Sequence, residues 1–240
     1  VGRVRKELDL VRRNVRYGQF VRVENQKKRV DWCLRKLEEN EGFIRHVFSD
    51  EAYVQLEPSA HSVWVARSDP YGHIVPNHKF PLKVMVWLGI SCGGAAQIKI
   101  FDRSCRLNSE GYQTLLEEVY IPFAVSTFGG VGNCVFVQDN APAHASKSTR
   151  RWIDEKGIQI EDWPAESPDL NPVEMVWSHM KATISREFKP RDLASLKAAI
   201  LSYYDKYITV ENCTKWSQHI HSQLPICIRR KGQPIRGPHD

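Results

Sequence analysis

The sequence predicts an α/β fold in which a mixed β-sheet is flanked by α-helices. Short β-type runs follow one another over residues 44–101, which favours antiparallel pairing. Strand and helix patterns then alternate over residues 108–177, and a mixed sheet covered by helices accommodates both patterns. Beyond Pro190, an amphipathic helix over residues 191–208 and a further helical stretch complete the expected fold.

The first expected element is a helix that follows a linker. Within residues 1–42, Val23, Val30, Leu34 and Leu37 are spaced for one helix face, and Gly42 is expected to end the helix. Residues 61–84 are rich in Pro and His and predict a hairpin with an extended loop. The remaining strands are expected at 44–50 with 52–58, 62–67, 83–91, 95–101, 133–138 and 158–162, and further helices at 108–125, at 144–157 and from near Asn171.

Composition limits the class of protein. With 240 residues, of which 42% are hydrophobic, the chain can bury one sizeable core. The apolar run Met85–Ile90 is far too short to span a membrane, and the amino terminus is charged from Arg3 onward, unlike a signal peptide. The six cysteines form no C-x-x-C pair. We therefore expect a soluble protein of a reducing compartment.

The net charge of +6 is concentrated at the front of the chain. Residues 1–36 hold 12 Lys or Arg against 4 acids, a net +8, so residues 37–240 sum to −2. A smaller basic tail covers residues 229–240. A basic arm on a near-neutral body indicates a polyanionic partner, because neutralising phosphates releases counterions. The alternative is an exposed, solvated helix face.

Two acids follow strand-type runs. Asp139 comes after "VFVQ" and before Asn-Ala-Pro, which cannot continue a central strand, so it is expected at the carboxyl end of a strand, where ligand crevices form. Ordinary turn chemistry would also explain this acid. Asp50 ends "HVFSD", and the adjacent Glu51 is an alternative, because neighbouring side chains on a strand point to opposite faces.

A third acid, Glu174, follows Asp139 after 34 intervening residues. In "NPVE", Asn171 could be the N-cap and Glu174 could close a capping box, which would explain this motif without chemistry. Three carboxylates from separate elements, however, also suit Mg²⁺ or Mn²⁺. Two such ions could support in-line displacement at a phosphodiester.

The motifs "FSDE", "VQDNAPAH" and "SPDLNPVEMVW", with this 34-residue interval, resemble the catalytic domain of Tc1/mariner transposases, specifically the Tc1-like branch. The segments "VRYGQFVRVENQKKR" and "KVMVWLGIS" are also similar to that family, so the resemblance covers nearly all of the chain. The related mariner branch has Asp at the third position, and Glu174 argues against it.

The resemblance implies an RNase H-like (retroviral integrase-like) fold over residues 43–228. It also implies Asp50, Asp139 and Glu174 as ligands of two Mg²⁺ ions, with Mn²⁺ as a substitute. Asn140 and His144 match positions near the site, and for His144 we favour a structural hydrogen bond over a ligand role. Asp169 and Trp177 are expected to position the helix and to pack in the core.

The same resemblance implies cleavage at transposon ends and transfer of a 3′-OH into target DNA, typically at TA. Family members carry two amino-terminal helix-turn-helix modules, and this chain begins about where the second would end. A DNA-bound homodimer held by a clamp-like loop near 61–80, and a nuclear location, are expected. The basic linker within residues 1–42 would then lie close to double-stranded DNA through Arg3, Arg5, Lys6, Arg12, Arg13 and Arg16.

Two other functions remain open from the sequence. A domesticated transposase would bind DNA or protein without transposing. A general RNase H-like nuclease would share the metal chemistry but would cut without regard to terminal repeats and would not join ends.

Overall fold

The computed structural model describes residues 20–55, 83–101 and 107–235. Its strands are β1 (His46–Gln55), β2 (Lys83–Ser91), β3 (Gly94–Ala95), β4 (Lys99–Ile100), β5 (Val135–Val137) and β6 (Gln159–Ile160). They form one six-stranded sheet in the order β3-β2-β1-β5-β6, with β4 paired to β2 outside this path. β1 runs antiparallel to β2 and parallel to β5, so the sheet is mixed, as expected.

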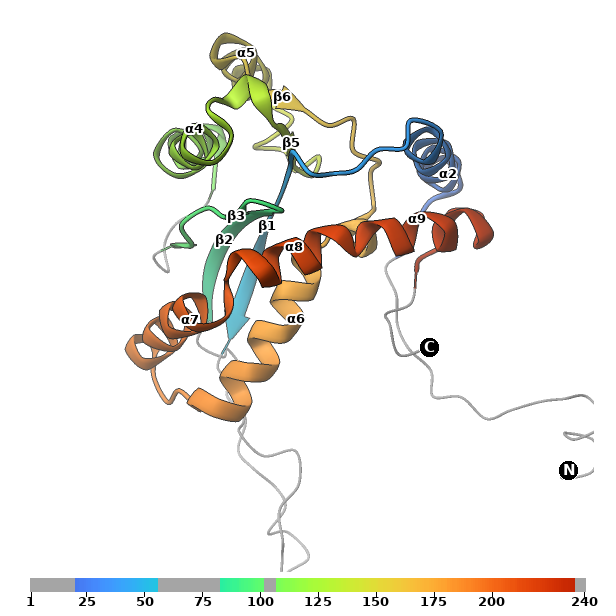
Figure 1. The fold of residues 1–240 in the computed structure, drawn as a ribbon. Helices are drawn as coiled ribbons and strands as arrows, with labels where there is room; N and C mark the ends of the chain where they lie inside the picture. Colours follow the sequence, from blue (N-terminus) through green and yellow to red (C-terminus); the bar gives the residue numbers. More distant parts are fainter. Residues whose placement is uncertain (1–19, 56–82, 102–106, 236–240) are drawn as a thin grey trace, which may run out of the picture.

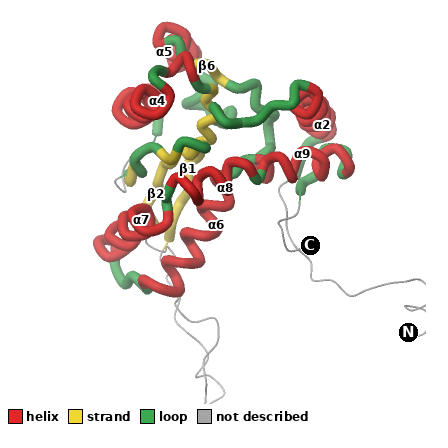
Figure 2. The backbone as a smooth tube through the Cα atoms, viewed as in Figure 1, coloured by secondary structure: helices red, strands yellow, loops and turns green. Residues whose placement is uncertain are grey.

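Helices cover both faces of this sheet (Figures 1 and 2). On one face lie α3 (Ser109–Leu115), α4 (Ile121–Phe128) and α5 (Lys147–Lys156). On the other lie α6 (Val173–Thr183), α7 (Leu193–Tyr207) and α8 (Val210–Gln218). α9 (Ile220–Arg229) continues from α8 and packs against α2 (Val23–Glu38). No helix in the described ranges is long and apolar enough to cross a membrane.

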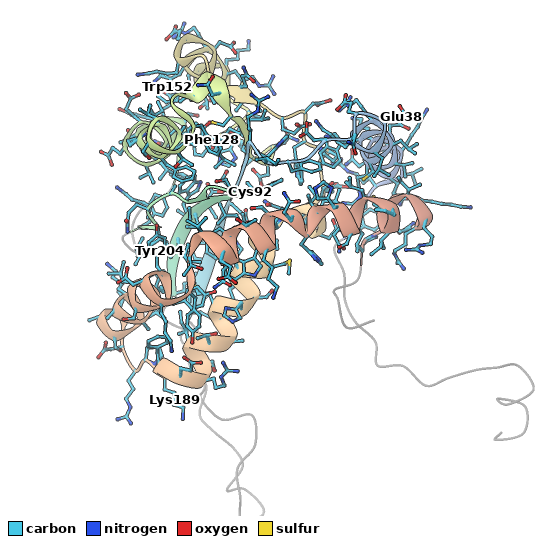
Figure 3. The ribbon with its side chains drawn as sticks, viewed as in Figure 1. Glu38, Cys92, Phe128, Trp152, Lys189 and Tyr204 are labelled. Carbon is cyan, nitrogen blue, oxygen red and sulfur yellow. The ribbon has the colours of Figure 1, made fainter. Side chains whose placement is uncertain are left out.

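Alternation along the strands builds a separate hydrophobic core on each face. Val47 and Phe136 are buried with α3–α5, whereas their neighbours Phe48 and Val137 are buried with α6–α9. Side chains of the helices complete the two layers (Figure 3), in which Phe128 and Trp152 belong to the α3–α5 side and Tyr204 to the opposite side. The central strands are therefore covered on both faces, which explains why β2 and β5 are almost continuously apolar.

Two expected elements differ in detail. The helix expected at 108–125 contains a π-helical turn over Leu116–Tyr120 before α4 begins. Pro122 explains this turn, because it has no N–H to donate to the preceding turn of a regular α-helix. The strand expected at 95–101 is reduced to β3 and β4. The strand expected at 62–67 and the loop near 61–80 lie outside the described residues, and the proposed domain boundaries stay a prediction.

A buried ionic cluster attaches α2 to the sheet. Glu161, only 8% exposed, follows β6 and lies 2.9 Å from Lys36 Nζ and 3.1 Å from His46 Nε2. Trp32 Nε1 donates a third hydrogen bond to Glu161 at 2.9 Å. Burial alone would raise the pKa of Glu161, but the hydrogen bonds from His46, Lys36 and Trp32 lower it to about 2. The ionised form of Glu161 is therefore the one that the fold stabilises.

Replacing Glu161 with Gln should lower the free energy of unfolding at pH 7 by about 1–3 kcal/mol, the usual range for a lost charged hydrogen bond. The folded-state pKa of about 2 lies below the ordinary value of 4.5. The stabilising contribution is therefore present above pH 4.5 and is lost as the pH falls toward 2. Urea denaturation of both proteins at pH 7 and at pH 3 measures this difference.

The adjacent Asp162 provides the matched control. Its side chain is 90% exposed and lies 3.5 Å from Arg35 Nη2, so Asp162→Asn should leave the unfolding free energy nearly unchanged. Equal losses for Glu161→Gln and Asp162→Asn would show that burial of the cluster contributes nothing.

Candidate active site

Asp50 and Asp139 are brought together by the parallel pairing of β1 and β5. In this register Phe48 lies opposite Val137, and each acid follows two residues later on its own strand. β5 ends at Val137, whereas β1 continues to Gln55, so Asp50 lies within β1, beside the point where β5 stops. Ser49 Oγ donates to the carbonyl oxygen of Val137 at 2.8 Å, which fixes the two strands at this position.

Asp50 faces α6. Its Oδ2 accepts a hydrogen bond from Trp177 Nε1 at 2.9 Å. Burial and the negative charge of Glu174 raise the pKa of Asp50 to about 7, although the Trp177 hydrogen bond partly offsets this rise. Trp177 is 2% exposed and packs in the core, so the expected positioning role for this residue agrees with its contacts.

Asp139 is the most accessible of the three acids, with a side chain that is 61% exposed. Its Oδ1 accepts from the backbone N–H of Ala141 at 2.9 Å and lies 2.7 Å from Nδ1 of His144. Burial opposes ionisation, but the hydrogen bonds from His144 and Ala141 outweigh it and lower the pKa of Asp139. Burial would likewise lower the pKa of His144, but hydrogen bonds with Asp139 and Glu51 raise it to about 9.

Glu174 occupies the first turn of α6, which Asn171 attaches to β1. Asn171 Nδ2 donates to the carbonyl oxygen of Ser49 at 3.1 Å, immediately before Asp50. The capping box considered from the sequence is not formed: the N-cap is Pro172, without a side-chain hydrogen bond, and Asn171 Oδ1 accepts weakly from Val173 N at 3.3 Å. Burial raises the pKa of Glu174. Glu174 is thus free of the capping role that its sequence allowed.

The three acids line one cavity of about 550 Å³, which Glu51, the alternative to Asp50 in the sequence, lines as well, together with Asn140 and Asn171. Among the described residues of this lining, none is His or Cys, so the available donors are oxygens. Such a set fits Mg²⁺ or Mn²⁺ better than Zn²⁺. A divalent cation would also relieve the repulsion that raises the pKa of Asp50.

Within the described residues, the three carboxylates do not form a preassembled metal site. In the part of the chain that the structure describes, no three His, Cys, Asp or Glu side chains lie close enough together to hold one metal ion. The like charges of the acids repel one another, and Asp50 and Asp139 are each held by a separate donor, Trp177 and His144. The three carboxylates would therefore move closer together to share an ion.

The loop between β6 and α6 is fastened to α2. The guanidinium of Arg29, which is 0% exposed, donates to both carboxylate oxygens of Asp169 at 2.7 Å and to the carbonyl oxygen of Glu166 at 2.9 Å. At the start of α2, the backbone N–H of Arg22 donates to Glu166 Oε2 at 2.8 Å. Asp169 also accepts from Ile235 N at 2.6 Å. Asp169 thus holds the loop that leads to Glu174, in line with the expected positioning role.

A second cavity, of about 740 Å³, adjoins the first and shares Asp139 and Asn140 with it. Lys28, Arg35 and Arg150 line it on the side of α2 and α5. The six basic residues predicted to bind DNA, from Arg3 to Arg16, lie outside the described residues.

The sequence did not single out several residues that shape the site. Ser49 joins β1 to β5, and Arg29 fastens the loop before α6. No pattern identified Ser49, because a serine within an apolar strand has no distinctive spacing. Arg29 lay within a basic run in which every residue could have been a solvated cation. Asn171 was considered only as a helix cap, although it also bonds to β1.

Comparison with known proteins gives the family. Residues 45–197 match the family model described as DDE superfamily endonuclease. The chain is 34% identical over 170 residues to the Tcb2 transposase of Caenorhabditis briggsae, covering 66% of this chain and 59% of that protein. It is 32% identical over 174 residues to the Tc1 transposase of Caenorhabditis elegans, covering 68% and 60%. The chain thus spans about three fifths of the length of these relatives.

Solved structures agree with the fold. A Mos1 mariner paired end complex with Mn superposes with a TM-score of 0.83 at 16% identity, covering 98% of this chain and 71% of that one. The catalytic domain of Mos1 mariner transposase superposes with a TM-score of 0.70 at 15% identity, covering 92% of this chain and all of that domain. The expected RNase H-like fold is confirmed. The chain belongs to the DDE superfamily of endonucleases, as a member of the Tc1/mariner family of transposases.

Proposed function

We propose that this chain is the catalytic part of a cut-and-paste DNA transposase. It would hydrolyse phosphodiester bonds at transposon ends and transfer the released 3′-OH into target DNA at TA sites. The observation that carries this proposal is the meeting of Asp50, Asp139 and Glu174 in one cavity at the end of β5. Membership of a DDE endonuclease family and the transposase names of the relatives support the same reaction.

The three acids would hold the metal ions together, and a different contact positions each of them. Two divalent ions, held by the three carboxylates, would activate the attacking oxygen and stabilise the leaving oxygen. Asp50 is held by Trp177, and Asp139 is held by His144, so both carboxylates are oriented by donors outside the cavity. Glu174 is placed by the start of α6 and so depends on the loop that Arg29 fastens.

The second cavity lies beside the acids and has a lining of mixed charge. Its basic residues Lys28, Arg35 and Arg150 stand among the acids Asp31, Asp154, Glu161 and Asp162, so phosphate contacts there would fall on the basic side chains alone. A phosphate backbone is attracted by such charges without any reading of its sequence. With the basic arm of residues 1–36, this surface would hold the ends of the element. We also propose that the protein acts in the nucleus as a homodimer on DNA, with one active site per subunit. Mos1 has been solved as a paired-end complex with a transposon end.

Replacing Asp139 with Asn, or Glu174 with Gln, should reduce Mg²⁺-dependent cleavage and strand transfer by about 1,000-fold or more. That factor corresponds to about 4 kcal/mol of lost transition-state stabilisation. The metal-free Glu174→Gln protein should be at least as stable as the parent, because burial disfavours the ionised form of Glu174. Gel assays of end cleavage and joining, with thermal unfolding of each protein, measure both effects.

Glu155→Gln is the matched control. Glu155 is exposed on α5, 3.6 Å from Arg151, and should be dispensable for both reactions. Full activity of Asp139→Asn or Glu174→Gln would overturn the metal-site assignment. A parent protein that binds DNA equally well without a divalent ion and never nicks it would instead be a domesticated binding module. Cutting of any duplex without joining would indicate a general nuclease.

Replacing all six basic residues of the arm with Gln should weaken DNA binding and make it less sensitive to salt. If each residue neutralises one phosphate, the slope of log affinity against log salt should fall in magnitude by about 5. Fluorescence anisotropy with a terminal-repeat duplex between 50 and 200 mM salt measures this slope. The substituted residues are Arg3, Arg5, Lys6, Arg12, Arg13 and Arg16.

Lys215→Gln serves as the control for this experiment. Lys215 is exposed on α8 and lines neither of the two cavities. Its replacement should leave the salt slope unchanged. An unchanged slope for the arm variant would mean that the arm is a solvated segment and not a phosphate contact.

A further inference from the structure

Glu51 has no explained role in the site described so far. It follows Asp50 in β1, and strand alternation directs it to the opposite face, toward α3. Glu51 Oε1 is buried, and its contact with His144 Nε2 is long, at 3.5 Å. A buried carboxylate oxygen is costly unless it is well paired, so this contact needs an explanation.

His144 lies between Glu51 and Asp139. Its Nδ1 is 2.7 Å from Asp139 Oδ1, and its Nε2 is 3.5 Å from Glu51 Oε1. The ring is 3% exposed, and Tyr112 stacks on it with a centroid separation of 3.9 Å and an interplanar angle of 28°. The imidazole thus bridges Asp139 and Glu51, which both line the 550 Å³ cavity.

Hydrogen bonds fix the surroundings of this ring. Tyr112 Oη donates to Gln138 Oε1 at 2.6 Å, next to Asp139 in the chain. Thr149 Oγ1 donates to the carbonyl oxygen of Ala143 at 2.7 Å, next to His144. The loop that carries Asp139 is therefore held on α3 and on α5, and the imidazole is held against tilting by Tyr112.

We propose that Glu51 and His144 act as a positioning pair for Asp139. Glu51 holds Nε2 of the imidazole, so that Nδ1 stays directed at Asp139 Oδ1 and fixes the plane of that carboxylate. Glu51 is then a positioning residue that acts through His144 and does not itself bind metal. This inference rests on the proposed function, because it assigns Asp139 to the ion site.

The geometry favours this reading over a direct ligand role for Glu51. Asp50 and Glu174 meet on the α6 side of the sheet, where Trp177 holds Asp50. Glu51 pairs in register with Trp87, whose side chain belongs to the opposite core. The contact of Glu51 with His144 lies on that same opposite side, with Tyr112. Glu51 also lines the cavity, but its contact with His144 directs it to the support of Asp139 and away from Asp50 and Glu174.

The test uses Glu51→Met, which removes the acceptor, and Glu51→Gln, which keeps an acceptor for Nε2. Mn²⁺ binding is measured by electron paramagnetic resonance without DNA, and the Mn²⁺ concentration for half-maximal cleavage is measured separately. Loss of a residue that orients a metal ligand commonly weakens metal binding by about 10-fold to 100-fold. Glu51→Met should weaken Mn²⁺ binding by a factor in this range, whereas Glu51→Gln should keep most of the parent affinity.

A double-mutant cycle tests whether Glu51 acts through His144. His144→Ala should weaken Mn²⁺ binding at least as much as Glu51→Met, and the double variant should be no worse than His144→Ala. His144→Asn keeps a donor near the position of Nδ1 and should be partly restored. Glu118→Gln, an exposed acid 3.0 Å from Lys99, should behave as the parent protein.

The outcomes separate this inference from the proposed function. If the losses of Mn²⁺ affinity caused by Glu51→Met and His144→Ala multiply in the double variant, Glu51 is an independent ligand and the inference is overturned. The same conclusion follows if Glu51→Gln loses as much Mn²⁺ affinity as Glu51→Met. Thermal unfolding should show no loss of stability in Glu51→Met, because the 3.5 Å contact with His144 is long and a carboxylate with a buried oxygen is removed. A parallel loss of stability would reduce Glu51 to a structural residue. A parent protein that binds no Mn²⁺ would instead refute the proposed function itself.

Discussion

The three-residue parallel pairing of β5 with β1 is the contact on which the rest of the site depends. It aligns Phe48 with Val137 and thereby sets Asp50 beside Asp139. A shift of one residue would send one of the two acids to the opposite face of the sheet. Two hydrogen bonds of Ser49 oppose such a shift. Its hydroxyl donates to the carbonyl oxygen of Val137, and its own carbonyl oxygen accepts from Asn171. The position of α6, and with it that of Glu174, is thus fixed relative to the same strand.

The acidic site opposes stability, so the fold has to be held together elsewhere. Burial and like charge raise the pKa of Asp50, which means that its ionised form is disfavoured in the folded protein. Two apolar cores, one on each face of the sheet, supply the compensating burial. The ionic cluster at Glu161 and the contact of Arg29 with Asp169 lie at the same end of the sheet, where they attach α2. Here each acid has a basic partner, whereas in the cavity Asp50 and Glu174 repel each other.

The fold class was predictable from the sequence because periodicity is a local property. The assignment of the three acids came from the resemblance to a family and stays a prediction, although the three side chains line one cavity. β2 was expected at residues 83–91 and occurs there, and α5 ends at the expected Gly157. The interruption before α4 depends on a single missing N–H at Pro122, which a count of apolar positions does not register. A structural hydrogen bond was expected for His144, which contacts Asp139 five residues away. The contact of His144 with Glu51 and that of Asn171 with Ser49 could not be predicted, because they join residues distant in the chain. Such pairs become visible only once strand register is known.

The contacts of Arg29 make the start of α6 depend on a segment far along the chain. Arg29 bonds to Asp169 and also to the carbonyl oxygen of Gly232, 203 residues away, while Ile235 N bonds to the same Asp169. The loop that leads to Glu174 is therefore held both by α2 and by the segment that follows α9. Changes near Gly232 can thus reach the acidic cavity through Asp169 without touching any of the three acids.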